Sequence, residues 1–215
     1  GIPEPEILEL GCAPGTILKT LHDLRPSSRC HGVDFSQPGL DAARQLFLSD
    51  GADVSLHLGD FRRIDLRRRF NLVASFGLVE HFEEAADAIR HHRRFCEPGG
   101  TVAITVPNLA SLVPGTVHRW VAPTDFATHN IDIMTPAALE NALASAGLVD
   151  IESGRFETAR FHAHSVVRPG MFAPAYRTVL RAWNATVDLL PFRLFWSAHV
   201  WAIGRAPSER LRCGI

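Results

Sequence analysis

The stretch that most constrains this chain is Ile-Leu-Glu-Leu-Gly-Cys-Ala-Pro-Gly at residues 7–15. Residues 7–10 are mainly apolar and predict a buried strand, and small residues follow them directly. Apolar residues then recur at helical spacing, namely Ile17, Leu18, Leu21 and Leu24. A strand, a glycine turn and a helix in this order leave free N–H groups at the helix start and let a ligand approach the backbone closely. The sequence therefore predicts a nucleotide-binding corner in an α/β fold.

Two glycine patterns compete at this turn. The dinucleotide-binding fingerprint G-x-G-x-x-G fails twice, because Ala13 and Thr16 stand where its second and third glycines belong. The shorter pattern E-x-G-x-G-x-G uses Glu9, Gly11 and Gly15 and departs only at Ala13. A turn without the helix-opening glycine suits a ligand with no pyrophosphate, and the charge of Glu9 would attract an ammonium group. An ordinary α/β turn is the alternative for this stretch alone.

A second acidic residue follows at a distance typical of nucleoside-binding folds. Residues 30–35 predict a strand that contains Asp34, about 20 residues beyond Gly15, and a carboxylate there can accept hydrogen bonds from ribose hydroxyls. Phe35 could then flank an adenine ring. The alternative is a helix cap, a role that Ser36 could itself take. The spacing supports a nucleoside and does not tell which cofactor carries it.

The composition fits one domain with a sizeable core. The chain has 215 residues, of which 46% are hydrophobic and 21% charged. A net charge of −1 argues against a dedicated nucleic-acid-binding protein. The cysteines lie far apart without a C-x-x-C pair, which predicts neither a zinc site nor a disulfide framework, so we expect a cytoplasmic protein. Arginines at 62, 63 and 67–69 alternate with aspartates and favour a solvated face.

The most distinctive pattern lies in the middle of the chain. A strand is predicted over residues 70–76, and Gly-Leu-Val-Glu-His-Phe follows at 77–82. This segment resembles the F-D-x-V-x-x-x-x-V-L-E-H sequence of small-molecule methyltransferases, including ubiquinone-type enzymes, with Asn71 in place of Asp. Glu-Pro-Gly-Gly at 97–100 resembles their L-K-P-G-G turn before strand five. Together with the glycine turn, these segments make residues 7–107 resemble the class I S-adenosylmethionine (SAM)-dependent methyltransferases.

The resemblance implies an α/β, Rossmann-like fold with a seven-stranded, mostly parallel sheet flanked by helices and an antiparallel last pair of strands. Further strands predicted from the pattern cover 54–58, 101–106, 148–156 and 197–204, and helices start at Glu83 and Thr135. We expect a single methyltransferase domain over residues 1–215, with a SAM-binding half at 1–107. Partly helical lid and substrate elements are expected at 108–134 and 157–196, and long connections of this kind are usually functional or disordered.

The resemblance also implies SAM as the cofactor and S-adenosylhomocysteine as its product. The cofactor-binding residues at matching positions are Glu9, Gly11, Cys12, Ala13, Gly15, Asp34, Phe35, Asp60, Phe61, Phe76 and Gly77. In the family, an acidic residue at the position of Asp60 bonds the adenine amino group and its neighbour packs on the ring. A plain Gly-Asp turn is the alternative. The signature of DNA amino-methyltransferases, Asn or Asp before two prolines and an aromatic residue, is missing.

His81 is the first candidate for a catalytic base, and His129 is the second. His81 follows the fourth strand, where the family places the methyl-accepting atom, and a histidine can accept a proton near neutral pH. The alternative is that Glu80 and His81 cap the next helix. We do not expect Glu80 to act with His81, because sequence neighbours point apart in a strand and do not share a helix face. No metal ligand is expected.

These observations predict methyl transfer from SAM to a small-molecule acceptor, with oxygen preferred over nitrogen or carbon. Aromatic and polar side chains in the two lid elements suit a substrate pocket, and the candidates are His118, Arg119, Trp120 and Tyr176. The alternatives are a non-catalytic SAM-binding regulatory module and an NAD(P)-dependent reductase. We expect no nucleic-acid or membrane partner, and a homodimer stays open.

Overall fold

The structure is a computed structural model, and it describes residues 4–49, 51–52, 54–158, 182, 185 and 197–208. Most of the predicted insertion at 157–196 therefore lies outside the described residues, as does the candidate substrate residue Tyr176. Among the helices that the described residues form, none is long and apolar enough to cross a membrane.

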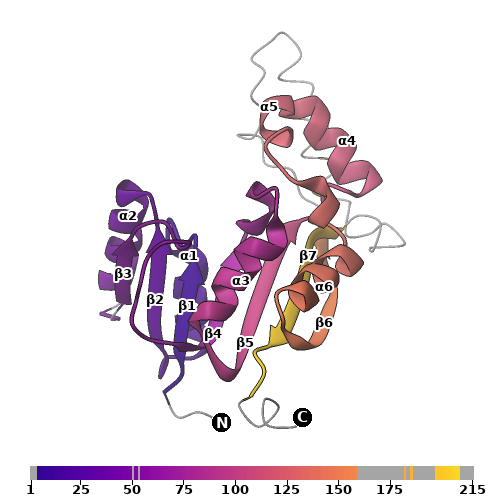
Figure 1. Cartoon of the computed structure of the whole chain (residues 1–215). Helices are drawn as coiled ribbons and strands as arrows, with labels where there is room; N and C mark the ends of the chain where they lie inside the picture. Colours follow the sequence, from indigo (N-terminus) through magenta and orange to yellow (C-terminus); the bar gives the residue numbers. More distant parts are fainter. Residues whose placement is uncertain are drawn as a thin grey trace, which may run out of the picture.

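Within these ranges, seven strands form one sheet in the order β3-β2-β1-β4-β5-β7-β6 (Figure 1). The strands are β1 (Glu6–Leu10), β2 (Arg29–Asp34), β3 (Val54–Leu58), β4 (Phe70–Phe76), β5 (Cys96–Pro107), β6 (Val149–Thr158) and β7 (Ser197–Arg205). The first five strands pair in parallel, and β7 lies antiparallel between β5 and β6. The predicted seven-stranded, mostly parallel sheet is confirmed.

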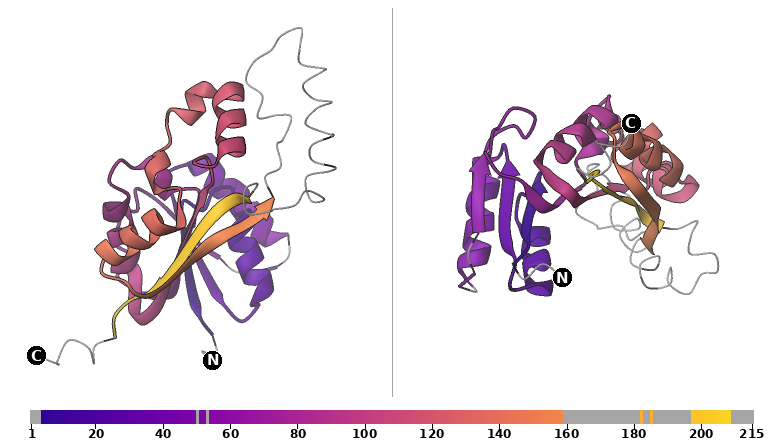
Figure 2. Two further views of the ribbon diagram at one scale, coloured as in Figure 1. Left: turned by 90° about the vertical axis from the view of Figure 1, so that its right-hand side faces the viewer. Right: turned by 60° about the horizontal axis from the view of Figure 1, so that its bottom comes forward.

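Helices cover both faces of the sheet (Figure 2). They are α1 (Thr16–Leu24), α2 (Gln37–Leu48), α3 (Ala85–Phe95), α4 (Leu112–Val121), α5 (Pro123–Phe126) and α6 (Pro136–Ser145), with 3-10 helices η1 (Val79–His81) and η2 (Ile131–Ile133). The helices α1 and α2 bury Leu18 and Phe47 in one core cluster. On the other face, α3 and α6 bury Ile89 and Leu143 in a second cluster.

The central strand β1 shows why this stretch folds as a buried strand. Ile7 belongs to the first cluster, and Leu8 and Leu10 belong to the second. Side chains alternate between the faces of a sheet, so helices on both faces require a strand that is apolar on both. The nearly continuous apolar run at residues 7–10 meets that requirement.

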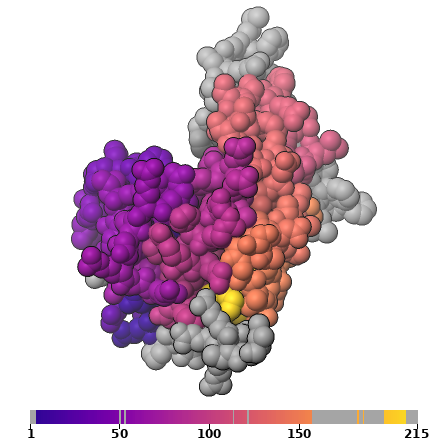
Figure 3. Space-filling view, in the orientation of Figure 1, coloured from indigo at the N-terminus to yellow at the C-terminus, as the bar shows by residue number. Residues whose placement is uncertain are grey.

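The connection over residues 108–134 is largely helical and contains α4, α5 and η2. Figure 1 shows α4 and α5 beyond the end of β5, on the side where the parallel strands end. In the space-filling view, this segment projects from the body of the molecule (Figure 3). It therefore lies at the edge of the sheet where parallel α/β folds bind ligands.

Several predicted boundaries differ from the structure, most of all the start of β5. Strand β5 begins at Cys96 rather than at 101, because Cys96 already pairs with Phe70 before a register shift in β4. The Glu-Pro-Gly-Gly segment is therefore an irregular start of β5, with Gly99 at a φ of 78°. The helix expected from Glu83 begins at Ala85.

The close packing of the glycine turn on α2 predicts an unequal response to two alanine substitutions. Gly15 has a φ of 94°, and a Cβ there would lie 2.5 Å from the Ala43 Cβ and 2.8 Å from the Ala43 Cα. Gly99 is also left-handed, but a Cβ there would meet nothing within 4 Å. Gly99→Ala should lower the free energy of unfolding by about 1 kcal/mol, and Gly15→Ala by at least about 3 kcal/mol. Urea unfolding measures both, and equal losses would contradict the packing of the turn on α2.

Candidate functional site

A pocket of about 240 Å³ lies where β1, β2 and β3 end. Its walls are Gly11, Val33, Asp34, Phe35, Gly59, Asp60, Phe61, Arg62, Leu78 and Phe82. The predicted cofactor residues Gly11, Asp34, Phe35, Asp60 and Phe61 are therefore brought together. Two larger hollows, of about 670 and 570 Å³, lie near the amino ends of the parallel strands. Their linings contain none of the predicted site residues.

Asp34 joins three segments of the pocket. Its Oδ2 accepts a hydrogen bond from the Ala13 N–H at 3.0 Å, and its Oδ1 accepts one from the Ser36 N–H at 2.8 Å. Ser36 in turn caps α2, since its Oγ accepts a hydrogen bond from the Gly39 N–H. Asp34 thus fixes the glycine turn against the end of β2. Each of its oxygens keeps a second lone pair for a ligand.

Glu9 is buried beneath the turn, with a relative exposure of 2%. Burial raises the pKa of its carboxyl from 4.5 to about 8, the Leu18 N–H acts against that shift, and the charge of Asp34 adds to it. Its Oε2 has no hydrogen-bond partner among the described residues. A donor or cation in this region would therefore relieve an unsatisfied buried oxygen.

Other predicted cofactor residues support the pocket without lining it. The Cys12 side chain lies in the core cluster shared by α1 and α2, so only its backbone can face a ligand. Gly15 is packed under Ala43. Phe76 and Gly77 end β4 outside the pocket walls, and the Gly77 N–H donates to the Thr105 carbonyl at 2.9 Å.

Arg62 lines the pocket and is exposed to solvent, as the sequence predicted. Its guanidinium binds the Asp60 carboxylate through two arms, at 3.0 and 2.7 Å, and stands 5.2 Å from the centre of the Phe82 ring. Hydrogen bonds from Arg62 lower the pKa of Asp60 to about 2. Asp60 is therefore ionised, and Arg62 is its protein partner at the pocket wall.

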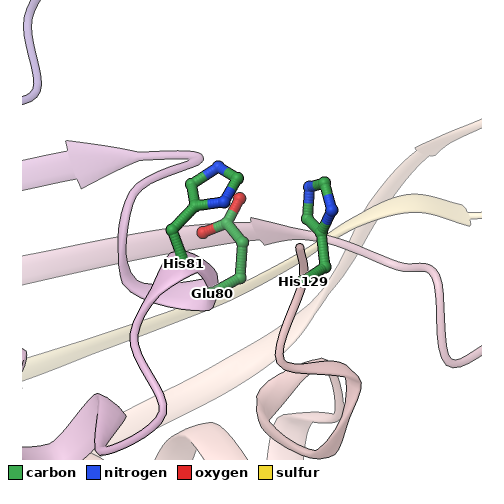
Figure 4. A group of neighbouring side chains, drawn as sticks. All are labelled: Glu80, His81 and His129. Atoms are coloured by element: carbon green, nitrogen blue, oxygen red, sulfur yellow. The ribbon is translucent and has the colours of Figure 1, made fainter. Parts of the chain in front are cut away.

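Glu80, His81 and His129 meet beside this pocket (Figure 4). Glu80 and His81 belong to η1, which lies between the pocket residues Leu78 and Phe82. The centres of the His81 and His129 rings are 4.7 Å apart. Glu80 is buried, and burial raises the pKa of its carboxyl from 4.5 to about 7. From the sequence, His81 and His129 were alternative candidates for the base, and Glu80 was not expected to act with His81. The structure places all three side chains together.

Asn130 explains how a residue from the second half of the chain reaches η1. Its N–H donates to the Glu80 carbonyl at 2.7 Å, and its Nδ2 donates to the carbonyls of Phe82 at 3.1 Å and Glu83 at 3.0 Å. These contacts fasten the segment after α5 to the segment after β4. His129, the preceding residue, is thereby held near His81.

The candidate substrate residues on α4 differ in their positions. The His118 ring lies 6.0 Å from the His129 ring, and its Nε2 pairs with the Asp125 Oδ2 at 2.7 Å. The Arg119 guanidinium lies over the Phe126 ring, and Trp120 is 65% exposed. Only His118 therefore adjoins the histidine pair.

Comparison with known proteins matches residues 7–100 to the family described as "Methyltransferase domain". An uncharacterised 37.1 kDa transposon protein from Streptomyces fradiae is 33% identical over 51% of this chain and 32% of its own length. A dTDP-3-amino-3,4,6-trideoxy-alpha-D-glucopyranose N,N-dimethyltransferase from Streptomyces venezuelae is 30% identical over 46% of this chain and 40% of its own length. A ubiquinone biosynthesis O-methyltransferase from Rhodopseudomonas palustris is 24% identical over 68% of this chain and 59% of its own length. The matched regions thus span less than two thirds of these relatives.

Solved structures share the fold over nearly the whole chain. Phosphoethanolamine N-methyltransferase 2 of Haemonchus contortus, solved with SAM, has a TM-score of 0.66 at 16% identity and covers 95% of this chain and 49% of its own. The [4+2]-cyclase SpnF has a TM-score of 0.65 at 18% identity and covers 96% and 76%. At such identities the likeness establishes the fold and not the reaction.

The strand order, the pocket at the glycine turn and the matched segment define a Rossmann-like methyltransferase domain. Residues 7–100 match a methyltransferase domain, and the predicted resemblance to SAM-dependent methyltransferases is confirmed over that segment.

Because the Glu9 carboxyl is buried, replacing it with an uncharged amide should stabilise the folded protein by an amount that depends on pH. A pKa of about 8 in the folded state, against 4.5 ordinarily, means that the unfolded chain releases this proton first as pH rises. Glu9 therefore lowers stability progressively between about pH 4.5 and pH 8. Glu9→Gln should raise the free energy of unfolding by about 3 kcal/mol more at pH 8 than at pH 5. Denaturant titrations at both pH values measure this, and a gain independent of pH would contradict it.

Proposed function

We propose that this protein binds SAM at the glycine turn and transfers its methyl group to a small-molecule acceptor. The observation that carries the proposal is the joint position of the Asp34 pocket and the Glu80–His81–His129 group, since η1 follows the pocket residue Leu78 and precedes the pocket residue Phe82 in the chain. A cofactor site with a proton-handling group beside it is what methylation of a hydroxyl group requires.

The pocket residues suit the parts of SAM. Free lone pairs on the Asp34 carboxylate would accept hydrogen bonds from the ribose hydroxyls. Phe35, which is 83% exposed, and the buried Phe61 both line the pocket, and their rings would contact the adenine. The unpartnered Glu9 Oε2 marks a place for positive charge beneath the turn, where the ammonium of SAM would be favourable.

In this reaction, the main contribution of the protein is to position the two reactants. When bound, SAM supplies a methyl group on a sulfonium, and the C–S bond breaks with its electron pair on sulfur. The pocket would hold this methyl in line with the acceptor, which is worth several kcal/mol of the barrier. The Glu80–His81–His129 group would promote loss of the acceptor proton, with His81 first and His129 second.

We propose oxygen as the acceptor atom. Methylation of a hydroxyl requires removal of its proton, whereas a neutral amine or a carboxylate can attack unaided. Two imidazoles at the pocket edge therefore favour a hydroxyl. The names of the relatives include both an N,N-dimethyltransferase and an O-methyltransferase, and either chemistry fits the domain. The segment 108–134 would contribute substrate contacts through His118, with Arg119 and Trp120 farther from the histidine pair.

Calorimetry tests the cofactor assignment. The protein should bind SAM and S-adenosylhomocysteine and should not bind NADH or NADPH, because its turn lacks the later dinucleotide glycines. Asp34→Ala should weaken SAM binding by about 1–3 kcal/mol, because hydrogen bonds to a charged acceptor are lost. Asp41→Ala, an exposed acid on α2, is the matched control and should leave the affinity unchanged. Micromolar NADH binding without SAM binding would instead support a reductase.

Turnover tests the role of the histidine group. Mass spectrometry of a metabolite extract incubated with methyl-labelled SAM would first identify the acceptor. With that acceptor, His81→Ala should lower kcat by at least about 100-fold, within the range that a positioned proton acceptor provides, and leave SAM affinity nearly unchanged. A loss under tenfold at several pH values would exclude this role for His81. SAM binding with no labelled product would support a non-catalytic regulatory module.

A further inference from the structure

One group of side chains among the described residues lies close enough together to hold a metal ion. It consists of Glu80, His81 and His129, and their nearest ligand atoms all lie within 4.8 Å of one another. Figure 4 shows the Glu80 carboxylate beside the His81 ring, with the His129 imidazole facing them from a separate segment. Ligand atoms about 2.1 Å from a shared ion are at most ~4.2 Å apart, so a closure of under about 1 Å would suffice.

Glu80 supplies an independent sign of a missing positive partner. The residue is 1% exposed, and its Oε2 has no hydrogen-bond partner among the described residues. An unpartnered carboxylate oxygen in the interior is unfavourable by several kcal/mol, and buried charges in proteins are normally paired or bound to metal. A cation between Glu80 and the two imidazoles would satisfy this oxygen.

His129 is already oriented as a ligand. Its Nδ1 lies 2.7 Å from the Asp125 carbonyl oxygen, which can only accept a hydrogen bond, so Nδ1 carries the proton. The Nε2 lone pair is therefore left for a ligand. Metal-bound histidines characteristically donate their other N–H to a backbone carbonyl or carboxylate. The three hydrogen bonds of Asn130 to the η1 segment hold this arrangement in place.

We propose that Glu80, His81 and His129 bind a divalent transition-metal ion at the edge of the cofactor pocket. Two imidazoles and one carboxylate favour zinc, iron, cobalt or manganese over magnesium and calcium, which prefer oxygen ligands alone. Three protein ligands leave at least one coordination position open, as in catalytic rather than structural sites.

The open position gives the ion a role in the reaction, and this step rests on the proposed function. An acceptor hydroxyl that coordinates there loses its proton to solvent more readily. The oxygen lone pair then forms the bond to the methyl carbon, and the electrons of the C–S bond stay on sulfur. His81 would act as a ligand in this scheme, and its loss would remove the ion. The acceptor class is a small molecule with a hydroxyl able to reach η1.

Metal binding is tested directly on the full chain. After removal of metal with a chelator and dialysis, Co²⁺ is titrated while its visible absorption is recorded, and Zn²⁺ binding is measured by calorimetry. One ion per chain is expected, with ligand-field bands typical of nitrogen and oxygen donors. His81→Ala and His129→Ala should each weaken binding at least about tenfold. Circular dichroism checks that the variants are folded, and His129 lies outside the helices and strands, which keeps that variant informative.

His118→Ala is the matched control for metal affinity. His118 lies 6.0 Å from His129 but pairs with Asp125, and the substitution should change the affinity less than twofold. The proposal would be overturned if the natural protein bound neither Co²⁺ nor Zn²⁺. It would also be overturned if His81→Ala, His129→Ala and His118→Ala bound the metal with equal affinity.

Two further readouts separate this proposal from the proposed function. If Co²⁺ binds as expected but SAM does not, the metal site stands and the methyltransferase assignment fails. If SAM binds, chelation should lower kcat at least about tenfold, with activity restored by added Zn²⁺, Co²⁺ or Mn²⁺. Full turnover in metal-free protein would overturn the metal's part in the reaction and leave His81 as the proton acceptor.

Discussion

The pocket depends first on the two hydrogen bonds of the Asp34 carboxylate. One oxygen holds the Ala13 N–H of the glycine turn and the other holds the Ser36 N–H at the start of α2. The Gly11 N–H adds a bond to the Val33 carbonyl at 2.8 Å. These contacts tie the ends of β1 and β2 into one rigid corner. Charge-assisted hydrogen bonds of this kind are stronger than neutral ones, which suits a corner that must hold its shape for a ligand.

The second organising contact joins two halves of the chain. Asn130 bonds the backbone of residues 80, 82 and 83, so the segment after α5 is attached to the end of β4. In the proposed function, the sheet would supply the cofactor side of the site, and this attachment would supply the acceptor side. The position of His129 beside η1 follows from it.

Local patterns account for how well the fold could be predicted. Strands over 54–58 and 70–76 were placed with their observed bounds, because each is a short alternating or apolar run bounded by polar residues or glycine. Asp34 was predicted from its spacing after the glycine turn, and Asp60 and Phe61 were predicted from the resemblance to the family. The structure brings the three together because parallel strands have their carboxyl ends on one side. The antiparallel position of β7 came only from the resemblance to a family, since pairing partners leave no local pattern.

The candidate site was predicted only in part, for physical reasons. The short 3-10 turn of η1 lets Glu80 and His81 serve one group, which neither strand nor helix periodicity predicts. The Asn130 bridge spans distant segments, and nothing local marks it. Arg62 is exposed, as predicted, but its pairing with Asp60 at the pocket wall was not predicted. The only sequence feature that could have indicated this pairing is the position of Asp60, an acidic residue, two residues before Arg62.

A crystal structure of the protein with S-adenosylhomocysteine would show where the ligand lies relative to Asp34 and η1. We expect the ribose on the Asp34 carboxylate, the adenine against Phe35 and Phe61, and the sulfur directed toward the Glu80–His81–His129 group. The methyl group of SAM would then face an acceptor at η1. A ligand bound at the amino ends of the parallel strands, or one whose sulfur points away from η1, would contradict the proposed function.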